Sequence, residues 1–300
     1  MSFEALSAYL DSLGTVYGLH GTDCQVMVGH EVVYRHQTGC SDYDGRRPVG
    51  SDDLYHIYSA SKVITMIAVL QLAERGRLSL DDEVAKYLPE FASMRVFDEF
   101  PVDVWPRIWP DAAAPTHAAK NPMLLHDMMS MTAGMSYDTA SAAIRAAQAR
   151  LGENASTREL VRAMAEMPLV CEPSTRWVYS LSHDVLAAVV EVVSGMRFGD
   201  YLRANLAEPL GIRDLFLQVP EELTTRLAAQ YRLDPTTEQV VPTDLGNAFR
   251  LSKCYESGGA GITCTLDAYA RVMEALANDG IGHTQKRILT PASIDAMRTN

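Results

Sequence analysis

A strongly apolar stretch follows directly on Lys62, where Val63 to Ala73 contains few polar residues. A helix that is apolar most of the way round is typical of the interior of a large domain. Arg75 and Gly76 come next, and they suit a helix end, because the helix dipole favours a cation there and glycine adopts the left-handed conformation. The pattern therefore predicts a buried helix that begins near Ser59 and ends before Gly76.

Apolar spacing predicts the remaining elements. An antiparallel hairpin is expected from strands 24–28 and 32–36, joined by a three-residue turn at residues 29–31. A short capped helix after Gly76 should stop at Pro89. Helical periodicity predicts further helices over residues 2–18, 123–134, 140–151, 157–167, 182–193, 198–207, 221–229 and 266–278.

Residues 92–123 interrupt this order, because they contain five prolines together with Trp105 and Trp109. A proline-rich run of this length is typical of an irregular excursion rather than of a helix or strand. The pattern is compatible with an excursion over a substrate cleft and equally with a surface insertion that has no role.

Composition narrows the class of protein. The chain has 300 residues, 47% of them hydrophobic, so it can bury a large core. A net charge of -12 argues against a nucleic acid or an anionic membrane as partner. No signal peptide and no transmembrane-length apolar run are recognisable. The five cysteines are scattered, odd in number and without a C-x-x-C pair, which predicts reduced thiols and a cytoplasmic location.

The start of the apolar helix carries the first candidate chemistry, in the sequence Tyr58-Ser59-Ala60-Ser61-Lys62. Residues three apart share a helix face, so the Lys62 amine can reach back to the Ser59 hydroxyl. A desolvated lysine can accept the serine proton, and N–H groups at the helix start can bind an oxyanion. Alternatively, Ser59 is only an N-cap and Lys62 a surface side chain, since roughly one S-x-x-K match arises by chance in a chain this long.

The surrounding motifs resemble those of the serine β-lactamase-like and penicillin-binding-protein superfamily, and most of all its class C β-lactamase and family VIII carboxylesterase branch. The resemblance runs along nearly the whole chain in the family's order. The motifs that carry it are Tyr58–Lys62, Gly76–Asp82, Tyr87–Phe91, Leu124–His126, Thr132–Gly134, Tyr179–Leu181, Glu208–Gly211, Ser257–Gly261 and Leu289–Pro291.

The second family motif is Tyr-x-Asn, and Tyr179-Ser180-Leu181 matches it except at the last position. The resemblance implies that Tyr179 relays the proton between Ser59 and the leaving group, since a phenol near a cation suits proton transfer. Leucine cannot make the amide hydrogen bonds of asparagine, which favours an esterase with an apolar acyl pocket over an efficient β-lactamase. Leu181 and Tyr58 are predicted to contact the substrate.

The third family motif, Lys or His followed by Thr or Ser and Gly, is not found. His283-Thr284-Gln285 precedes Leu289-Thr290-Pro291, whereas the motif follows it in relatives. In the family that strand supplies the second oxyanion N–H. The sequence is therefore expected to be a fragment lacking the C-terminal strands, or else a protein with half of the oxyanion hole.

The resemblance implies an α/β (α+β) fold of the β-lactamase/transpeptidase type over residues 1–300. A sheet lobe is expected over about 1–58 and 236–300, and a mostly helical lobe over about 59–235. The implied activity is a serine hydrolase acting through an acyl-enzyme on small carboxylic esters. A β-lactamase, a D-Ala-type peptidase and a non-catalytic protein that binds an acyl ligand are the alternatives, with an ester, amide or β-lactam as the small-molecule partner.

Other catalytic classes find no support in the motifs. The eight histidines form no H-E-x-x-H, H-x-H or Cys/His cluster, so neither a metal site nor any cofactor is expected. A G-x-S-x-G elbow and the glycine-rich nucleotide motifs are also missing. His183 is predicted to be a surface histidine of its helix rather than a general base.

Overall fold

The computed structural model describes residues 2–101, 109 and 113–299. They form two compact units. The first unit contains Met1–Ile57, Ala207–Asn247 and Thr263–Asn300, and the second contains Tyr58–Leu206 and Ala248–Ile262. The units thus differ from the expected lobes, because residues 207–235 belong with the first unit and 248–262 with the second. That the whole chain is one catalytic domain remains a prediction.

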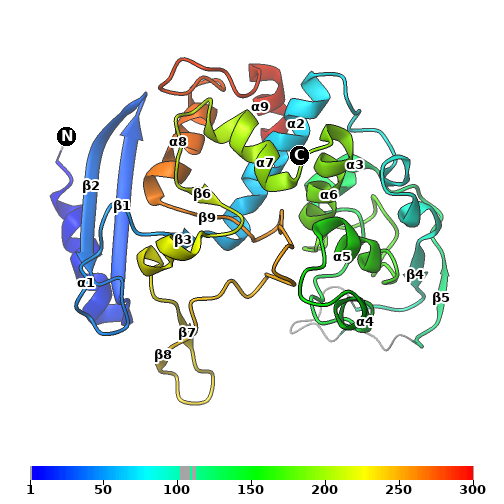
Figure 1. Ribbon diagram of the computed structural model, residues 1–300, viewed down its shortest axis with the longest axis horizontal. Coiled ribbons are helices and arrows are strands. Elements are labelled where there is room, and N and C mark those ends of the chain that lie inside the picture. The colour runs from blue at the N-terminus through cyan, green and yellow to red at the C-terminus, as the bar shows by residue number, and fades with distance from the viewer. Residues whose placement is uncertain (1, 102–108, 110–112, 300) are drawn as a thin grey trace. The chain divides into compact units, whose positions relative to one another are not determined.

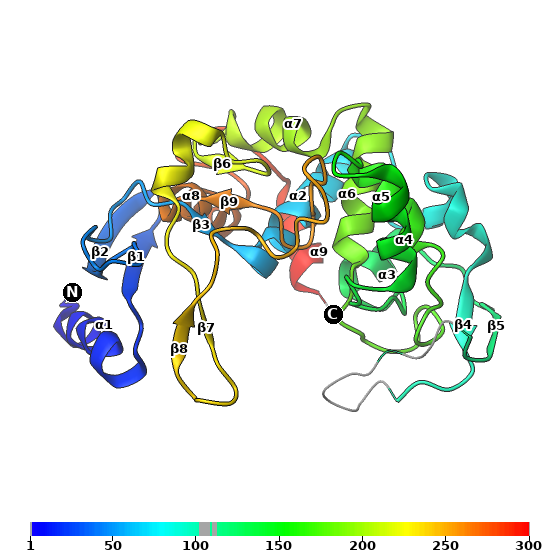
Figure 2. The ribbon, with the colours of Figure 1, turned by 60° about the horizontal axis from the view of Figure 1, so that its bottom comes forward.

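A helix and a hairpin begin the first unit. Helix α1 (Glu4–Tyr17) packs on strand β2 (Glu31–Gly39), which pairs with β1 (Gly21–Val28) in antiparallel register. Figures 1 and 2 both show α1 beside this hairpin. The hairpin was predicted, but its turn has two residues instead of three, since Glu31 pairs with Val28. Gly29 has φ 59°, and this left-handed conformation permits the tighter turn.

Short antiparallel strands and two helices complete the first unit. The strand order of its three-stranded sheet is β3-β9-β6, and β7 and β8 form a separate hairpin, coloured yellow in Figure 1. Helix α8 packs against β1, and the helix expected over 221–229 is a 3₁₀ turn over 221–226. The bounds are β3 Tyr55–His56, β6 Leu215–Phe216, β7 Tyr231–Leu233, β8 Val240–Pro242, β9 Thr263–Cys264, α8 Leu266–Ala277 and α9 Pro291–Arg298.

The second unit is mostly helical and is organised around α6 (Ser182–Ser194), which contacts α2, α3, α5 and α7 (Figure 1). Every residue from Ser182 to Val190 is buried, so α6 is a central helix rather than a surface one. Gly195 ends it with φ 75°. The other helices are α2 Ser61–Glu74, α3 Leu125–Ser130, α4 Ala142–Leu151, α5 Thr157–Met164 and α7 Phe198–Leu202.

Most of the helices predicted for this unit are present, and they are shorter than the predicted ranges. Helix α5 begins at a capping box in which Ser156 and Glu159 satisfy each other's backbone N–H groups. Helix α7 gives way to a π-helical turn over Arg203–Ala207, which shortens the helix expected over 198–207. Instead of ending a helix, Pro89 begins a 3₁₀ turn, a position where its missing N–H costs nothing.

The proline-rich excursion begins and ends in regular structure. Strand β4 (Arg95–Phe97) pairs with β5 (Thr116–Ala118) in a two-stranded antiparallel sheet. The prediction of an irregular excursion is therefore wrong at its two ends, where β4 and β5 lie. Its central part, including Trp105, lies outside the described residues.

Candidate active site

The start of α2 places Ser59 at the surface of the second unit. A 3₁₀ turn over Tyr58–Ala60 leads into α2, and Ser59 is exposed within it. Tyr58 has φ 43°, a left-handed conformation that costs a non-glycine residue of the order of 1–3 kcal/mol. Such a strained backbone persists only where the surroundings enforce it, and here it immediately precedes the candidate nucleophile.

Lys62 is the second residue of α2, three residues after Ser59, and it is buried, with 8% of its surface exposed. Its Nζ donates to the Gly259 carbonyl at 2.7 Å and lies 3.4 Å from Ser59 Oγ. Nζ also sits 4.7 Å from the centroid of the Tyr179 ring. The predicted i, i+3 geometry is therefore present, and the Gly259 carbonyl fixes where the amine points.

Tyr179 reaches the same hydroxyl from a distant part of the sequence. Its phenol donates to Ser59 Oγ at 2.6 Å. The structure thus brings together the three side chains that the motifs singled out, Ser59, Lys62 and Tyr179, within the second unit. An exposed hydroxyl in hydrogen-bond reach of an amine and a phenol has the geometry of an activated nucleophile.

Tyr137 is a further contact of Ser59 that no sequence motif indicated. Its phenol interacts with the Ser59 side chain, and its ring lies 5.1 Å from that of Tyr179. Burial, reinforced by Tyr179 and Asp184, raises the pKa of Tyr137 above its usual range. Tyr137 is therefore held as a neutral phenol, which suits a hydrogen-bonding role at Ser59 better than that of a base.

The glycine-rich segment Ser257–Gly261 packs against Ser61 and Thr65 of α2. Thr65 Oγ1 donates to the Gly258 carbonyl at 2.7 Å, and Ser61 Oγ accepts from the Ile262 N–H at 3.2 Å. A Cβ on Gly258 would lie 2.2 Å from the His183 carbonyl oxygen, so only glycine fits there. This close approach brings the Gly259 carbonyl to Lys62.

Asp184 of α6 holds the other side of that segment. Its carboxylate accepts from Tyr255 Oη and from Ser257 Oγ, both at 2.6 Å, and from the Gly259 N–H. Burial raises the pKa of this carboxyl, while the hydrogen bonds and nearby Lys62 oppose the rise. One buried carboxylate therefore fixes the peptide whose carbonyl orients Lys62.

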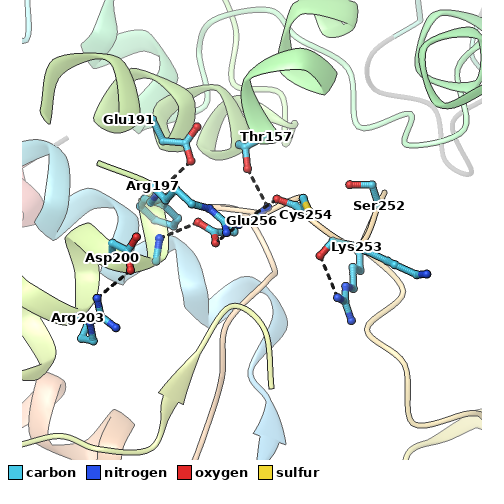
Figure 3. A network of polar contacts seen from close by, with 12 residues as sticks. Thr157, Glu191, Arg197, Asp200, Arg203, Ser252, Lys253, Cys254 and Glu256 are labelled. Atoms are coloured by element: carbon cyan, nitrogen blue, oxygen red, sulfur yellow. Dashed lines mark hydrogen bonds and ion pairs between the residues drawn. The ribbon is translucent and has the colours of Figure 1, made fainter. Parts of the chain in front are cut away.

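Glu256, between the two residues that bond Asp184, points the opposite way, as expected of an extended segment with a two-residue period. Its carboxylate accepts from Arg197 Nη2 at 2.6 Å and from the Gly199 N–H at 2.8 Å. Its own N–H donates to Thr157 Oγ1 at 2.8 Å (Figure 3). The segment is thus bound on both of its faces.

Replacing Asp184 by asparagine is expected to lower both stability and activity. Tyr255 and Ser257 both donate to Oδ1, which the amide keeps, but its NH₂ group would replace the oxygen beside the Gly259 N–H. That N–H then loses its acceptor, and the free energy of unfolding should fall by about 1–3 kcal/mol. Ester kcat/KM should fall with it, because the Gly259 carbonyl shifts away from Lys62. Urea unfolding and initial rates measure both. Asp200→Asn is the control, since Asp200 forms an exposed pair with Arg203; equal effects of the two variants would contradict the role of Asp184.

His183 corrects one sequence expectation, because it is buried at 2% exposure instead of lying on the helix surface. Neither ring nitrogen has a hydrogen-bond partner among the described residues. Burial first, and Lys62 second, lower the pKa of His183 to about 3. The neutral ring is part of the interior of the second unit, and it makes no contact of the kind a catalytic triad requires.

The stability of the protein should fall on acidification through His183. Its folded pKa lies below the ordinary value of 6.5, so its contribution is complete above pH 6.5 and is lost as the pH falls toward 3. At pH 5 the loss is about 2 kcal/mol, at about 1.4 kcal/mol per pH unit. Urea unfolding at pH 7.5 and 5 should show a smaller difference for His183→Leu than for the wild type. The same pH dependence in both proteins would rule this assignment out.

The two predicted substrate contacts lie in different surroundings. Tyr58 is partly exposed, and its ring meets that of Phe249 edge-on at 5.9 Å. Leu181 is the N-cap residue of α6, and its side chain is buried at 2% exposure. Leu181 can thus shape an adjoining pocket but presents little surface of its own. Both substrate contacts remain predictions.

Cavity size alone does not point to this site. A cavity of about 580 Å³ in the second unit is lined by residues 83, 85, 91–95, 118–123 and 173, and not by Ser59, Lys62 or Tyr179. A second, of about 370 Å³, is lined by Ser136 and Asp138, the neighbours of Tyr137. The site is therefore assigned from the hydrogen bonds of Ser59.

Two further features are absent from the described residues. No helix among them is long and apolar enough to cross a membrane. No group of three or more His, Cys, Asp or Glu side chains in the same residues is arranged to hold a metal ion.

Comparison with known proteins agrees with the motifs. Esterase EstB of Burkholderia gladioli is 32% identical over 274 residues, which cover 83% of this chain and 64% of that protein. An uncharacterized protein of Mycobacterium tuberculosis is 28% identical over 286 residues, covering 94% of this chain and 68% of its own length. The chain thus spans about two thirds of the length of these curated relatives.

The fold is shared with solved structures. EstCE1, described as a hydrolase with promiscuous acyltransferase activity, superimposes with a TM-score of 0.75 at 23% identity, over 99% of this chain and 77% of its own. The predicted β-lactamase-like α/β fold is confirmed by this match. The Beta-lactamase family model matches residues 6–300, and the chain belongs to the β-lactamase family.

Proposed function

We propose that this chain is a serine hydrolase that cleaves small carboxylic esters through an acyl-enzyme on Ser59. One observation carries the proposal: the exposed Ser59 Oγ lies 2.6 Å from the Tyr179 phenol and 3.4 Å from Lys62 Nζ. The name of EstB, an esterase, and the description of EstCE1 as a hydrolase support the same reaction class.

The proposed reaction transfers the acyl group twice, first from the ester to Ser59 and then from Ser59 to water. Ser59 Oγ attacks the ester carbonyl carbon, its proton passes to the Lys62 and Tyr179 pair, and the pair returns it to the departing alkoxide. The Ser59 N–H at the start of α2 helps hold the oxyanion. Water then attacks the acyl-enzyme, gives its proton to the same pair and releases the carboxylic acid, while Ser59 regains its proton.

The proposal also ranks three classes of substrate. Small esters come first, because Leu181 cannot offer the amide hydrogen bonds that asparagine makes in Tyr-x-Asn motifs. β-Lactams come next, and peptides with a D-amino acid follow.

Covalent labelling tests the proposal. The 300-residue chain, and any longer natural form of it, is incubated with a fluorophosphonate and separately with a fluorescent penicillin, and intact mass and peptide mapping follow. A single adduct on Ser59, rather than on Ser61, is expected, with the fluorophosphonate reacting faster. A folded protein without an adduct in either form would overturn the hydrolase proposal in favour of a non-catalytic protein that binds an acyl ligand.

Leu181→Asn tests the substrate ranking. The amide should raise nitrocefin hydrolysis relative to p-nitrophenyl acetate hydrolysis, because it offers hydrogen bonds to an acylamino group. A buried amide should also lower the free energy of unfolding by about 1–3 kcal/mol, so the two rates are compared as a ratio within each protein. An unchanged ratio would remove Leu181 from the specificity argument.

A cytoplasmic location belongs to the same proposal. The five cysteines have neither the even number nor the spacing of a disulfide framework, which favours a reducing compartment. Fractionation of the producing cells measures it, and recovery of the protein outside the cytoplasm would contradict it.

A further inference from the structure

Five aromatic side chains form a continuous series of ring contacts in the second unit. Neighbouring rings lie 5.9 Å apart for Tyr58 and Phe249, 5.7 Å for Phe249 and Tyr137, 5.1 Å for Tyr137 and Tyr179, and 6.1 Å for Tyr179 and Trp177. The residues come from four separate stretches of the sequence. We call this series of five residues the aromatic arc.

The arc passes directly beside the nucleophile. Of its two middle members, Tyr179 donates to Ser59 Oγ at 2.6 Å, and the phenol of Tyr137 interacts with the same side chain. Lys62 Nζ lies 5.7 Å and 4.7 Å from the centroids of the same two rings. A ligand ring near Ser59 would therefore meet aromatic side chains on the protein.

The Trp177 end of the arc faces solvent. Within the extended segment before α6, Val178 is fully buried, whereas Trp177 and Tyr179 point to the other side, in keeping with a two-residue period. Trp177 is 63% exposed. A single exposed aromatic residue needs no explanation, but this one extends a series of rings that passes beside the proposed nucleophile. Aromatic surfaces of this kind are typical of binding sites.

The position of Trp177 also indicates which half of an ester it meets. In the proposed reaction Tyr179 belongs to the pair that returns the proton to the departing alkoxide, so the alcohol group must lie on the side of Tyr179. Trp177 adjoins Tyr179 and is separated from Tyr58 and Phe249 by the two central rings. The alcohol group is thus the part of the ester closest to Trp177.

We propose that Trp177 binds the alcohol portion of the substrate by stacking, so that esters of arylmethyl and similar flat apolar alcohols are preferred over esters of short alkyl alcohols. This inference rests on the proposed esterase function and deepens it. Aromatic contacts of this kind change rates about two- to ten-fold.

A pair of acetate esters isolates this effect. Benzyl acetate and ethyl acetate form the same acetyl-enzyme, so the ratio of their kcat/KM values, measured by titrating released acid, reports on the alcohol group alone. The benzyl-to-ethyl ratio should fall about two- to ten-fold in Trp177→Ala and be largely kept in Trp177→Phe. Tyr9→Ala, which removes an aromatic residue that is 55% exposed in the first unit, should leave the ratio unchanged.

Each outcome decides the inference. An unchanged ratio in Trp177→Ala would overturn it while leaving the esterase proposal intact. A loss seen instead for ethyl phenylacetate relative to ethyl acetate would place the ring on the acyl side and would overturn the assignment to the alcohol. No Ser59-dependent turnover of either acetate would remove the proposed function and this inference together.

Discussion

Ser59→Ala is expected to abolish ester hydrolysis, with kcat/KM for p-nitrophenyl acetate reduced by about 10⁴-fold or more. No other hydroxyl is proposed to form the acyl bond, so the variant should also fail to react with a fluorophosphonate. The side chain is exposed, so the free energy of unfolding should stay within about 0.5 kcal/mol of the wild type.

The matched control is Ser130→Ala, which removes a serine hydroxyl from the exposed end of α3 in the same unit. It should retain the wild-type rate. Turnover that survives in Ser59→Ala would show that the esterase mechanism is wrong, whatever the labelling result.

Tyr179→Phe is expected to lower kcat/KM by about 10²- to 10⁴-fold, because it removes a hydroxyl from the pair that is proposed to carry the proton. Tyr137→Phe removes a hydroxyl from the same serine, but its phenol is held neutral by burial. The second variant should therefore lose only the effect of one hydrogen bond, about ten-fold or less. The difference is measured by the initial rates of ester hydrolysis of the two variants, under conditions in which both are fully folded.

The two variants are a matched pair, because each removes one phenol oxygen next to Ser59. A larger loss in Tyr137→Phe than in Tyr179→Phe would reverse the two roles and make Tyr137 the proton carrier. Losses below ten-fold in both would contradict the role of Tyr179 and favour Lys62 as the group that accepts the proton.

Local contacts of the site were predictable from sequence. Ser59 and Lys62 are three residues apart at the start of one apolar helix, and helix geometry alone predicted that they meet. The fold class, the β1–β2 hairpin and most helices followed from periodicity and from the order of the family motifs. Tyr179 required the motif, since periodicity says nothing about a contact across 120 residues.

Contacts that depend on packing between distant segments were missed. Tyr137 lies in an irregular stretch with no motif, and no motif pointed to Asp184. His183 was misplaced because the apolar pattern of α6 did not show that its first turn is buried too. The boundaries of the two units were missed for the same reason, since the segment 248–262 joins the second unit through hydrogen bonds to α2 and α6.

The contact between Lys62 and the Gly259 carbonyl spans 197 residues of sequence. Loop closure over such a separation is slow relative to helix formation, so this contact forms late in folding. During synthesis on the ribosome, α2 and α6 emerge long before Tyr255–Gly261, and Asp184 then lacks the partners that it has in the native chain. The contacts of Lys62 and Asp184 with this segment can therefore form only after residues 255–261 have been translated, so a nascent chain that ends before them lacks the native surroundings of Ser59.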